Sequence, residues 1–204
     1  MKPEFRNVLA IAGLFLLAAC STSEKKTENV QEVYPETPKE VPVQTQAELI
    51  KRGLYLTTIG ACNDCHSPKK MTPRGPEPDP SRLLSGHPQG EKLPAIKNNQ
   101  DWILFSQGLT AFVGPWGVSY AANLTPDDSG IGSWSFEQFK TAVTKGKYKG
   151  MEGSRDLLPP MPWALYKNFT EDDLKAVFVY LKSLPPVNNV VPSPVAPPDM
   201  LTLK

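Results

Sequence analysis

Residues 61–68, ACNDCHSP, place two cysteines three positions apart and a histidine directly after the second. This CxxCH pattern is specific for covalent attachment of a c-type haem, because the two thiols can add to the vinyl groups of the porphyrin while the histidine offers its imidazole to the iron. A chain that uses the motif in this way must wrap a large apolar cofactor. We therefore expect one covalent haem c, bound through Cys62 and Cys65, with His66 as an axial ligand of the iron.

The cysteine and histidine content leaves three other uses of the motif to weigh. The chain has three cysteines and two histidines. A zinc site would have to combine Cys62, Cys65, His66 and His87, of which two are sequence neighbours that would crowd a tetrahedral metal. A thioredoxin-like dithiol would need a surrounding βαβ pattern, and the sequence around the motif has no such alternation. A plain structural disulfide would leave the position of the histidine unexplained.

The first twenty residues have the pattern of an exported lipoprotein. Lys2 and Arg6 precede an apolar run over residues 8–19, which is too short to span a bilayer well. The run ends in LAAC, which resembles the bacterial lipobox, where the cysteine is lipidated and becomes the new N-terminus. We expect residues 1–19 to be a signal peptide and Cys20 to be a lipid anchor in a membrane. An uncleaved signal anchor is the alternative, although it would need a longer apolar segment.

The segments that flank the expected domain are polar or rich in proline. Residues 20–44 are charged and contain three prolines, which predicts a disordered tether, and residues 187–204 form an extended, proline-rich tail. Without residues 1–19, the totals of 22 basic and 21 acidic residues fall to 20 of each. A balanced chain has no electrostatic footprint for nucleic acid, so we expect no nucleic-acid partner.

Three helices are expected in a domain over residues 45–186. Thr45 and Ser135 each begin a capping box, and Thr170 precedes three acidic residues that suit a helix N-terminus. The first helix carries its apolar face onward to the CxxCH motif, so one helix is predicted to lead into the haem site. Residues 67–133 are rich in proline and glycine and are predicted to be mostly loops with one short helix. The pattern predicts an all-α class.

A haem that transfers electrons without changing its coordination needs a sixth ligand, and a thioether is the usual one that raises the reduction potential. Met161 lies in LLPPMPW, where prolines fix the backbone on both sides of it. Met71 is close to the CxxCH motif, Met151 lies in a glycine-containing loop, and Met200 lies in the tail. His87, in LSGHPQG, is a competing ligand that would give a bis-histidine haem of lower potential. Met161 is therefore the predicted sixth ligand.

Three segments of the chain carry a resemblance to a known family. They are residues 52–68 (RGLYLTTIGACNDCHSP), 114–147 (GPWGVSYAANLTPDDSGIGSWSFEQFKTAVTKGK) and 157–187 (LLPPMPWALYKNFTEDDLKAVFVYLKSLPPV). They resemble the bacterial monohaem and multihaem c-type cytochromes that serve as electron-accepting subunits of membrane dehydrogenases. The resemblance covers most of the expected domain. It implies a cytochrome c-like fold, with about three main helices and long loops rich in proline and glycine around one covalent haem.

The resemblance also implies roles for four residues of this chain. Cys62 and Cys65 would bind the haem, His66 would be one axial ligand, and Met161, in the PPMPW segment, would be the other. One departure matters, because many relatives carry two or three CxxCH motifs and this chain has one. That departure argues against a wire of several haems and against a peroxidase-like enzyme.

The function that follows is an electron carrier rather than an enzyme. We expect a membrane-tethered, periplasmic, monohaem cytochrome that passes single electrons from a dehydrogenase to an acceptor such as an oxidase or another cytochrome. A permanent electron-accepting subunit of a dehydrogenase complex is one alternative, and a gas sensor with a displaceable sixth ligand is another. A basic cluster near the middle helix could steer an acidic partner or could be an ordinary solvated face. Its members are Lys140, Lys145, Lys147 and Lys149.

Overall fold

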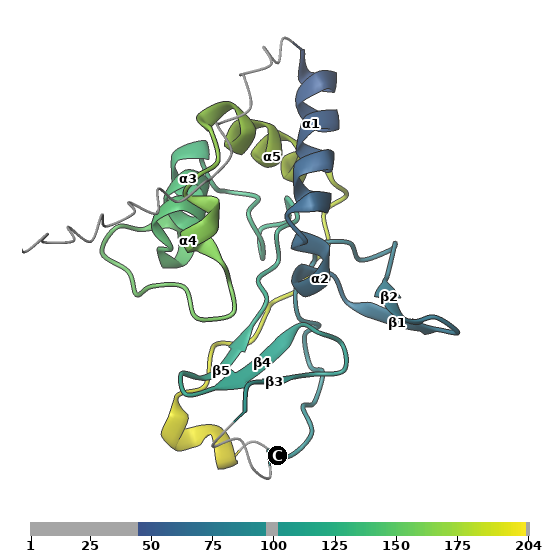
Figure 1. Ribbon diagram of the computed structural model, residues 1–204, viewed down its shortest axis with the longest axis vertical. Coiled ribbons are helices and arrows are strands. Elements are labelled where there is room, and N and C mark those ends of the chain that lie inside the picture. The colour runs from purple at the N-terminus through teal and green to yellow at the C-terminus, as the bar shows by residue number, and fades with distance from the viewer. Residues whose placement is uncertain (1–44, 97–101, 203–204) are drawn as a thin grey trace, which may run out of the picture. The chain divides into compact units, whose positions relative to one another are not determined.

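Three long helices and two small antiparallel sheets dominate the described part of the chain, which is residues 45–96 and 102–202 of the computed structural model (Figure 1). The predicted signal peptide, Cys20 and the predicted tether lie outside the described residues. The expected all-α class is not confirmed, because the segment predicted to be mostly loops contains β-strands.

The three residues at which the sequence predicts helix starts are the N-caps of the long helices. Capping boxes fix the first two helix starts. The Thr45 hydroxyl accepts from the backbone N–H of Glu48, and Ser135 forms the same capping box with Gln138. Thr170 caps the last helix by accepting from the N–H of Asp173. The helices are α1 Gln46–Ile59, α3 Phe136–Lys145 and α5 Glu171–Ser183.

The helix predicted to run into the CxxCH motif is interrupted, so that expectation is wrong. α1 ends at Ile59, Ala61 takes a left-handed backbone conformation with φ of 56°, and the motif forms a separate short helix, α2, over Cys62–His66. A left-handed residue cannot continue a right-handed helix, so the chain changes direction before the first cysteine. The remaining short helices are η1 Tyr148–Gly150, α4 Trp163–Tyr166 and η2 Pro197–Thr202.

Five short strands occupy the segment between α2 and α3. The first two form a hairpin, and the other three form a sheet in the order β3-β4-β5. Proline and glycine obscure this pattern in the sequence, because each strand is only two to four residues long. The strands are β1 Lys69–Thr72, β2 Gly75–Pro78, β3 Leu104–Phe105, β4 Ala111–Gly114 and β5 Gly117–Tyr120.

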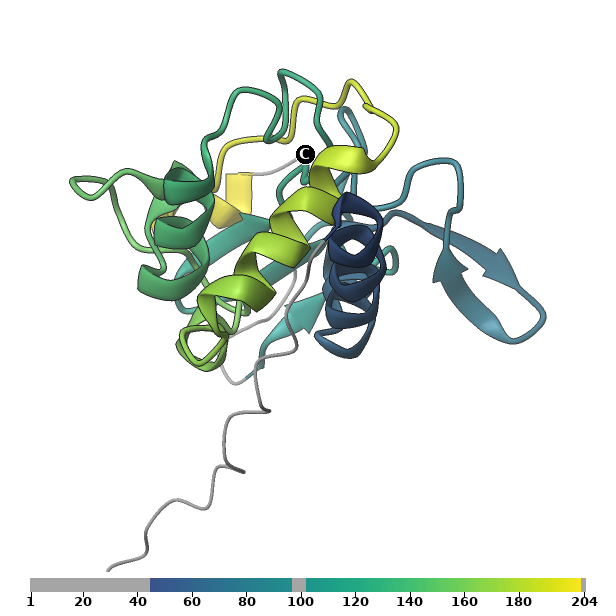
Figure 2. The same ribbon diagram turned by 90° about the horizontal axis from the view of Figure 1, so that it is seen from above.

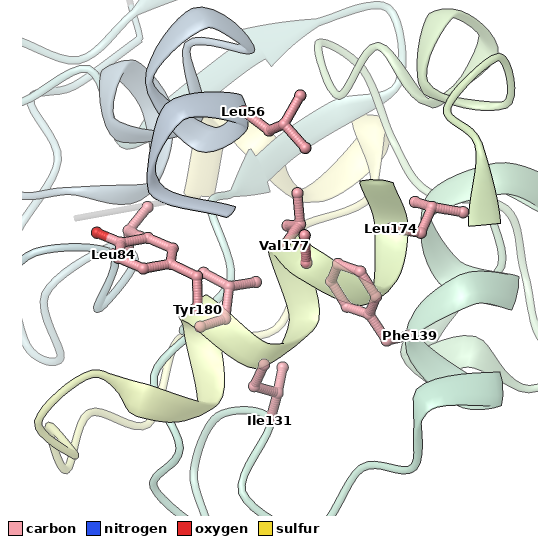
Figure 3. Packing of buried hydrophobic residues seen from close by; sticks show 9 residues of the cluster. Leu56, Leu84, Ile131, Phe139, Leu174, Val177 and Tyr180 are labelled. Atoms are coloured by element: carbon pink, nitrogen blue, oxygen red, sulfur yellow. The ribbon is translucent and has the colours of Figure 1, made fainter. Parts of the chain in front are cut away.

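The main core lies where α1 crosses α5, and Figure 2 shows these two helices side by side. Gly53 permits the close approach, since a Cβ atom there would lie 2.1 Å from the carbonyl oxygen of Ala176. At the periphery of the crossing, Arg52 Nε and Asp173 Oδ1 are 2.8 Å apart. Figure 3 shows members of the buried cluster around the crossing: Leu56, Leu84, Ile131, Phe139, Leu174, Val177 and Tyr180.

Residues 187–195, which we call the C-terminal belt, lie along the domain. The Asn189 side chain donates to the carbonyl oxygens of Ser85 at 2.6 Å and His87 at 2.9 Å. Further along, Val195 exchanges two backbone hydrogen bonds with Val118 of β5. The belt therefore joins the loop after the β1–β2 hairpin to the edge of the three-stranded sheet. Within residues 45–96 and 102–202, no helix combines the length and the apolar character needed to cross a membrane.

Candidate functional site

The two cysteines of the CxxCH motif lie on α2, where a spacing of three residues brings side chains to the same helix face. Both thiols are free and partly buried, and Cys62 packs against the main core. Burial raises the pKa of the Cys62 thiol to about 11 and raises that of Cys65 as well. The redox thiols of thioredoxin-like proteins have lowered pKa values, so the raised values of Cys62 and Cys65 do not match a thioredoxin-like dithiol.

His66 is held in one orientation and one tautomer. Its Nδ1 atom lies 2.8 Å from the carbonyl oxygen of Ala122. Because a carbonyl oxygen can only accept, Nδ1 carries the proton and Nε2 keeps a free lone pair. Desolvation also lowers the pKa of His66, which keeps the imidazole neutral. A neutral histidine whose Nδ1–H is bound to a backbone carbonyl is the arrangement that a metal-ligating imidazole requires.

Met161 lies in a loop, residues 157–162, that is fastened to two other elements. At its start, the N–H of Leu157 donates to the carbonyl oxygen of Gly146, the residue that caps α3, at 2.6 Å. The hydroxyl of Ser119 on β5 donates to the carbonyl oxygen of Pro159 at 2.6 Å. The Met161 side chain is partly buried. The structure therefore holds this methionine in a loop tied both to a helix end and to the sheet.

Hydrogen bonds link the segments of His66 and Met161 into a closed circuit, which we call the ligand frame. Residues 119–122 hold both, because Ala122 accepts from His66 while Ser119 donates to Pro159. On the other side, the Tyr166 hydroxyl of α4 donates to the carbonyl oxygen of Gly60, just before α2, at 2.6 Å. Figure 1 shows α2 and α4 facing each other above the three-stranded sheet.

The framing residues were not identified from the sequence. Ser119, Ala122 and Tyr166 contact the ligand segments through bonds that span 40, 56 and 106 positions along the chain. All three bonds use backbone carbonyl oxygens as acceptors, which every residue has, so no motif marks them. The strand that carries Ser119 is only four residues long and its first three residues are all buried, so no alternating pattern marks it in the sequence.

The other methionines lie outside the ligand frame. Met71 is 76% exposed on the β1–β2 hairpin, and Met151 is 50% exposed in the loop after η1. Met200 is buried beside Val113 and Val118 in a second small core under the three-stranded sheet. Among the described methionines, Met161 alone belongs to a segment that is bonded to the frame.

His87 is fully buried, with its Nδ1 atom 2.9 Å from the hydroxyl oxygen of Thr110 and its ring 4.8 Å from that of Tyr120. Burial lowers its pKa. Its Nε2 atom has no hydrogen-bond partner within the described ranges. No cluster of three or more histidine, cysteine or acidic side chains that could hold a metal ion occurs in the part of the chain that the structure describes. The zinc site that would need His87 beside the CxxCH motif therefore has no structural support.

The basic cluster expected near the middle helix is largely neutralised by acidic partners. Lys149 differs from the others, since its ammonium lies 5.6 Å from the centre of the Tyr148 ring. Exposed ion pairs stabilise little, but each cancels most of the field of its lysine at a distance. The ordinary solvated face thus describes this surface better than a steering patch. The pairs are Lys140–Glu171, Lys145–Glu152 and Lys147–Asp156.

These residues fit a covalently bound haem c. Two neutral thiols lie on one face of α2, an imidazole with a free Nε2 follows them, and a methionine lies in a loop bonded to the same frame. Apolar side chains of the main core reach Cys62, which suits the apolar porphyrin. A c-type cytochrome would use such a set of side chains, because two thioethers and a histidine are the identifying features of that class.

Comparison with known proteins supports the same class. The chain is 30% identical over 67% of its length to the gluconate 2-dehydrogenase cytochrome c subunit of Pantoea cypripedii, and 26% identical over 92% to the fructose dehydrogenase cytochrome subunit of Gluconobacter japonicus. It is also 29% identical over 79% to a nicotinate dehydrogenase subunit of Pseudomonas putida. The chain is a homologue of cytochrome c subunits of dehydrogenases, which confirms the resemblance drawn from its sequence.

The similarity covers only a part of each relative. The matched regions span 23% of the gluconate dehydrogenase subunit, 29% of the fructose dehydrogenase subunit and 11% of the nicotinate dehydrogenase subunit. No protein-family profile matches the chain. Haem c is the cofactor that the relatives imply.

Proposed function

We propose that this chain is a monohaem c-type cytochrome that passes single electrons from a dehydrogenase to an acceptor such as an oxidase or another cytochrome. The observation that carries the proposal is the 2.8 Å hydrogen bond from His66 Nδ1 to the carbonyl oxygen of Ala122, directly after two free cysteines. It leaves Nε2 unprotonated and fixed in direction, as an axial ligand must be. The fold proposed around it is cytochrome c-like, with two small sheets added to the helices.

Each of the four site residues has a distinct role in this proposal. Cys62 and Cys65 would hold the porphyrin through thioether bonds, so the cofactor would not dissociate. His66 and Met161 would be the two ligands of the iron, and hydrogen bonds of the frame hold the segments that carry them. When bound, haem c supplies one-electron chemistry through the Fe(III)/Fe(II) couple. With His66 and Met161 both bound to it, the group would transfer electrons without a substrate having to bind.

A dehydrogenase is the proposed electron donor because the relatives are named as subunits of gluconate, fructose and nicotinate dehydrogenases. The same names favour a permanent subunit of such a complex over a carrier that moves between complexes. Detergent extraction of the native protein followed by gel filtration separates the two. Co-purification of a dehydrogenase in equal amount identifies a permanent subunit, and recovery of the cytochrome alone identifies a carrier.

The proposed location is the periplasmic face of a membrane, with Cys20 as the lipid anchor after removal of residues 1–19. The support is the LAAC sequence at the end of a short apolar run. Mass spectrometry of the mature protein should find an acylated Cys20 at the N-terminus, and Cys20→Ala should leave an unprocessed precursor. An unmodified Cys20 in mature protein would refute this location.

The site itself is tested by haem analysis and by one substitution with a matched control. The purified protein should hold one haem per chain that acid and acetone fail to extract. Ferric protein should show the weak red absorption band of iron bound to sulfur, and Met161→Ala should abolish it, lower the potential and admit carbon monoxide to the ferrous iron. Met71→Leu, at an exposed methionine on the β1–β2 hairpin, should change none of these.

Three results would overturn parts of the proposal. Extractable haem, or zinc in equal amount to protein, would refute covalent haem attachment. A red band that survives Met161→Ala would refute Met161 as the ligand. Rapid carbon monoxide binding by the unmutated ferrous protein would identify a sensor in place of an electron carrier, because a stable iron–thioether bond must break before an external ligand can enter.

A further inference from the structure

Ser119 lies between two hydrogen bonds that run in one direction. The indole Nε1–H of Trp116 donates to the Ser119 hydroxyl oxygen at 3.2 Å, and the hydroxyl oxygen lies 2.6 Å from the carbonyl oxygen of Pro159. Indole nitrogen can only donate and a carbonyl oxygen can only accept. The single hydroxyl hydrogen of Ser119 must therefore point at Pro159, which makes the serine a relay between the sheet and the Met161 loop.

The sheet holds this relay in place. Ser119 is buried on β5 and is paired in register with Phe112 of β4. The Trp116 ring lies against Gly114, where a Cβ atom would come within 2.5 Å of the ring. A rotation of the indole is therefore restricted by the turn that carries it. The edge of β5 is also fixed by the two backbone hydrogen bonds between Val118 and the C-terminal belt.

The part of the loop directly around Met161 has few backbone donors with which to be held. Pro159, Pro160 and Pro162 have no N–H group, so this part of the loop can be fixed mainly through its carbonyl oxygens. Ser119 binds the carbonyl two residues before Met161. The next side-chain tie of this segment to the frame is Tyr166, five residues after Met161. Met161 thus lies between these two hydrogen-bonded residues along the chain.

We infer that Ser119, supported by Trp116, is a positioning residue that keeps Met161 seated as an axial ligand. This inference rests on the proposed function, in which Met161 binds the iron. A thioether is a weak neutral ligand, so its retention depends on how little the loop moves when the bond opens. With the relay present, the loop returns to one position. Without it, the opened loop can move away and an external ligand gains time to bind.

The test measures ligand replacement at the ferric iron of the haem-loaded, full-length protein. Ser119→Ala removes the relay, and imidazole should then displace the sulfur with about a threefold to tenfold higher apparent affinity, the range expected from the loss of one hydrogen bond. The red band of the variant should weaken or disappear at a lower pH than in the unmutated protein. Ser119→Thr keeps the hydroxyl on a residue suited to a strand and should restore both properties.

Ser154→Ala is the matched control, because its hydroxyl donates to the carbonyl oxygen of Tyr148 at 2.7 Å in a loop outside the ligand frame. It should leave imidazole binding unchanged. Trp116→Phe keeps an aromatic ring but removes the N–H, and should shift imidazole binding in the same direction as Ser119→Ala but less. Unfolding by urea, followed by far-UV circular dichroism, shows whether any shift reflects a general loss of stability.

The outcomes separate this inference from the proposed function. If the unmutated protein lacks the red band, Met161 is not the ligand and the proposed function fails. If the band is present and Ser119→Ala binds imidazole like the unmutated protein, the positioning role is refuted while the function stands. If Ser119→Ala raises imidazole affinity but lowers the free energy of unfolding by a comparable amount, and Ser119→Thr restores neither, a specific positioning role is refuted.

Discussion

Gly53→Ala tests the helix crossing on which the core depends. In an exposed helix this substitution would stabilise by about 1 kcal/mol, because alanine has the higher helix propensity. Here the new Cβ atom would lie 2.1 Å from the carbonyl oxygen of Ala176 and 2.5 Å from the Cβ atom of Tyr180. Neither atom is the end of a flexible side chain, so α1 and α5 must separate by roughly 1 Å to restore an ordinary contact distance.

The expected loss follows from these two opposing effects. Overpacking of a tight core costs about 1–3 kcal/mol, and contact with a backbone atom favours the upper end. After subtraction of the propensity gain, the free energy of unfolding should fall by about 2 kcal/mol. For a domain of this size that is a decrease of roughly 4–8 °C in Tm.

Thermal and urea unfolding of the haem-loaded protein, followed by far-UV circular dichroism, measure this loss. Gly153→Ala is the control, because a Cβ atom at Gly153 would meet no atom within 4 Å, and its Tm should stay within about 1–2 °C of the unmutated protein, as for other surface substitutions. A Gly53→Ala protein as stable as the unmutated one would refute the close crossing of α1 and α5.

Two further predictions concern pH. Asp79 is buried, and hydrogen bonds from Lys70, Ser81 and Arg82 hold the pKa of its carboxyl well below the usual range. The ionised carboxylate therefore stabilises the fold at neutral pH, and this stabilisation is lost progressively below about pH 4. Asp79→Asn should lower Tm more at pH 7 than at pH 3. Burial raises the pKa of Tyr166 to about 12. The neutral phenol therefore contributes to the free energy of unfolding below about pH 10, and this contribution is lost as the pH rises toward 12. Urea unfolding at pH 8 and pH 11 should show the stability difference between unmutated protein and Tyr166→Phe shrinking at the higher pH.

Local signals in the sequence predicted the helices because their causes are local. The capping boxes at Thr45 and Ser135 involve residues only three positions apart, and both form in the structure. The predicted continuation of α1 into the CxxCH motif was wrong because the cause of the break is not local. Apolar spacing continues through Ala61, but Ala61 takes a left-handed conformation, and the adjacent Gly60 accepts a hydrogen bond from Tyr166, a contact 106 positions away that no short window contains.

The residues of the candidate site could be proposed from the sequence, but the hydrogen bonds that hold them in place could not. The spacing of Cys62, Cys65 and His66 is a covalent requirement of the cofactor, and it can be seen in any sequence that satisfies it. The orientation of His66 instead depends on the carbonyl oxygen of Ala122, which is 56 positions away and chemically like every other carbonyl. The strands that bring Ala122 there are too short for a period-2 pattern to identify.

The C-terminal belt has a consequence for the order in which the chain folds. Asn189 reaches Ser85 and His87 across 104 and 102 positions, so these contacts close some of the longest loops in the domain. Loop-closure entropy delays such contacts, whereas the hairpin of β4 and β5 needs only local ones. We expect the belt to dock late during folding and to detach early during unfolding. The edge of β5 at Val118 and the loop around His87 would then lose their contacts with the belt together.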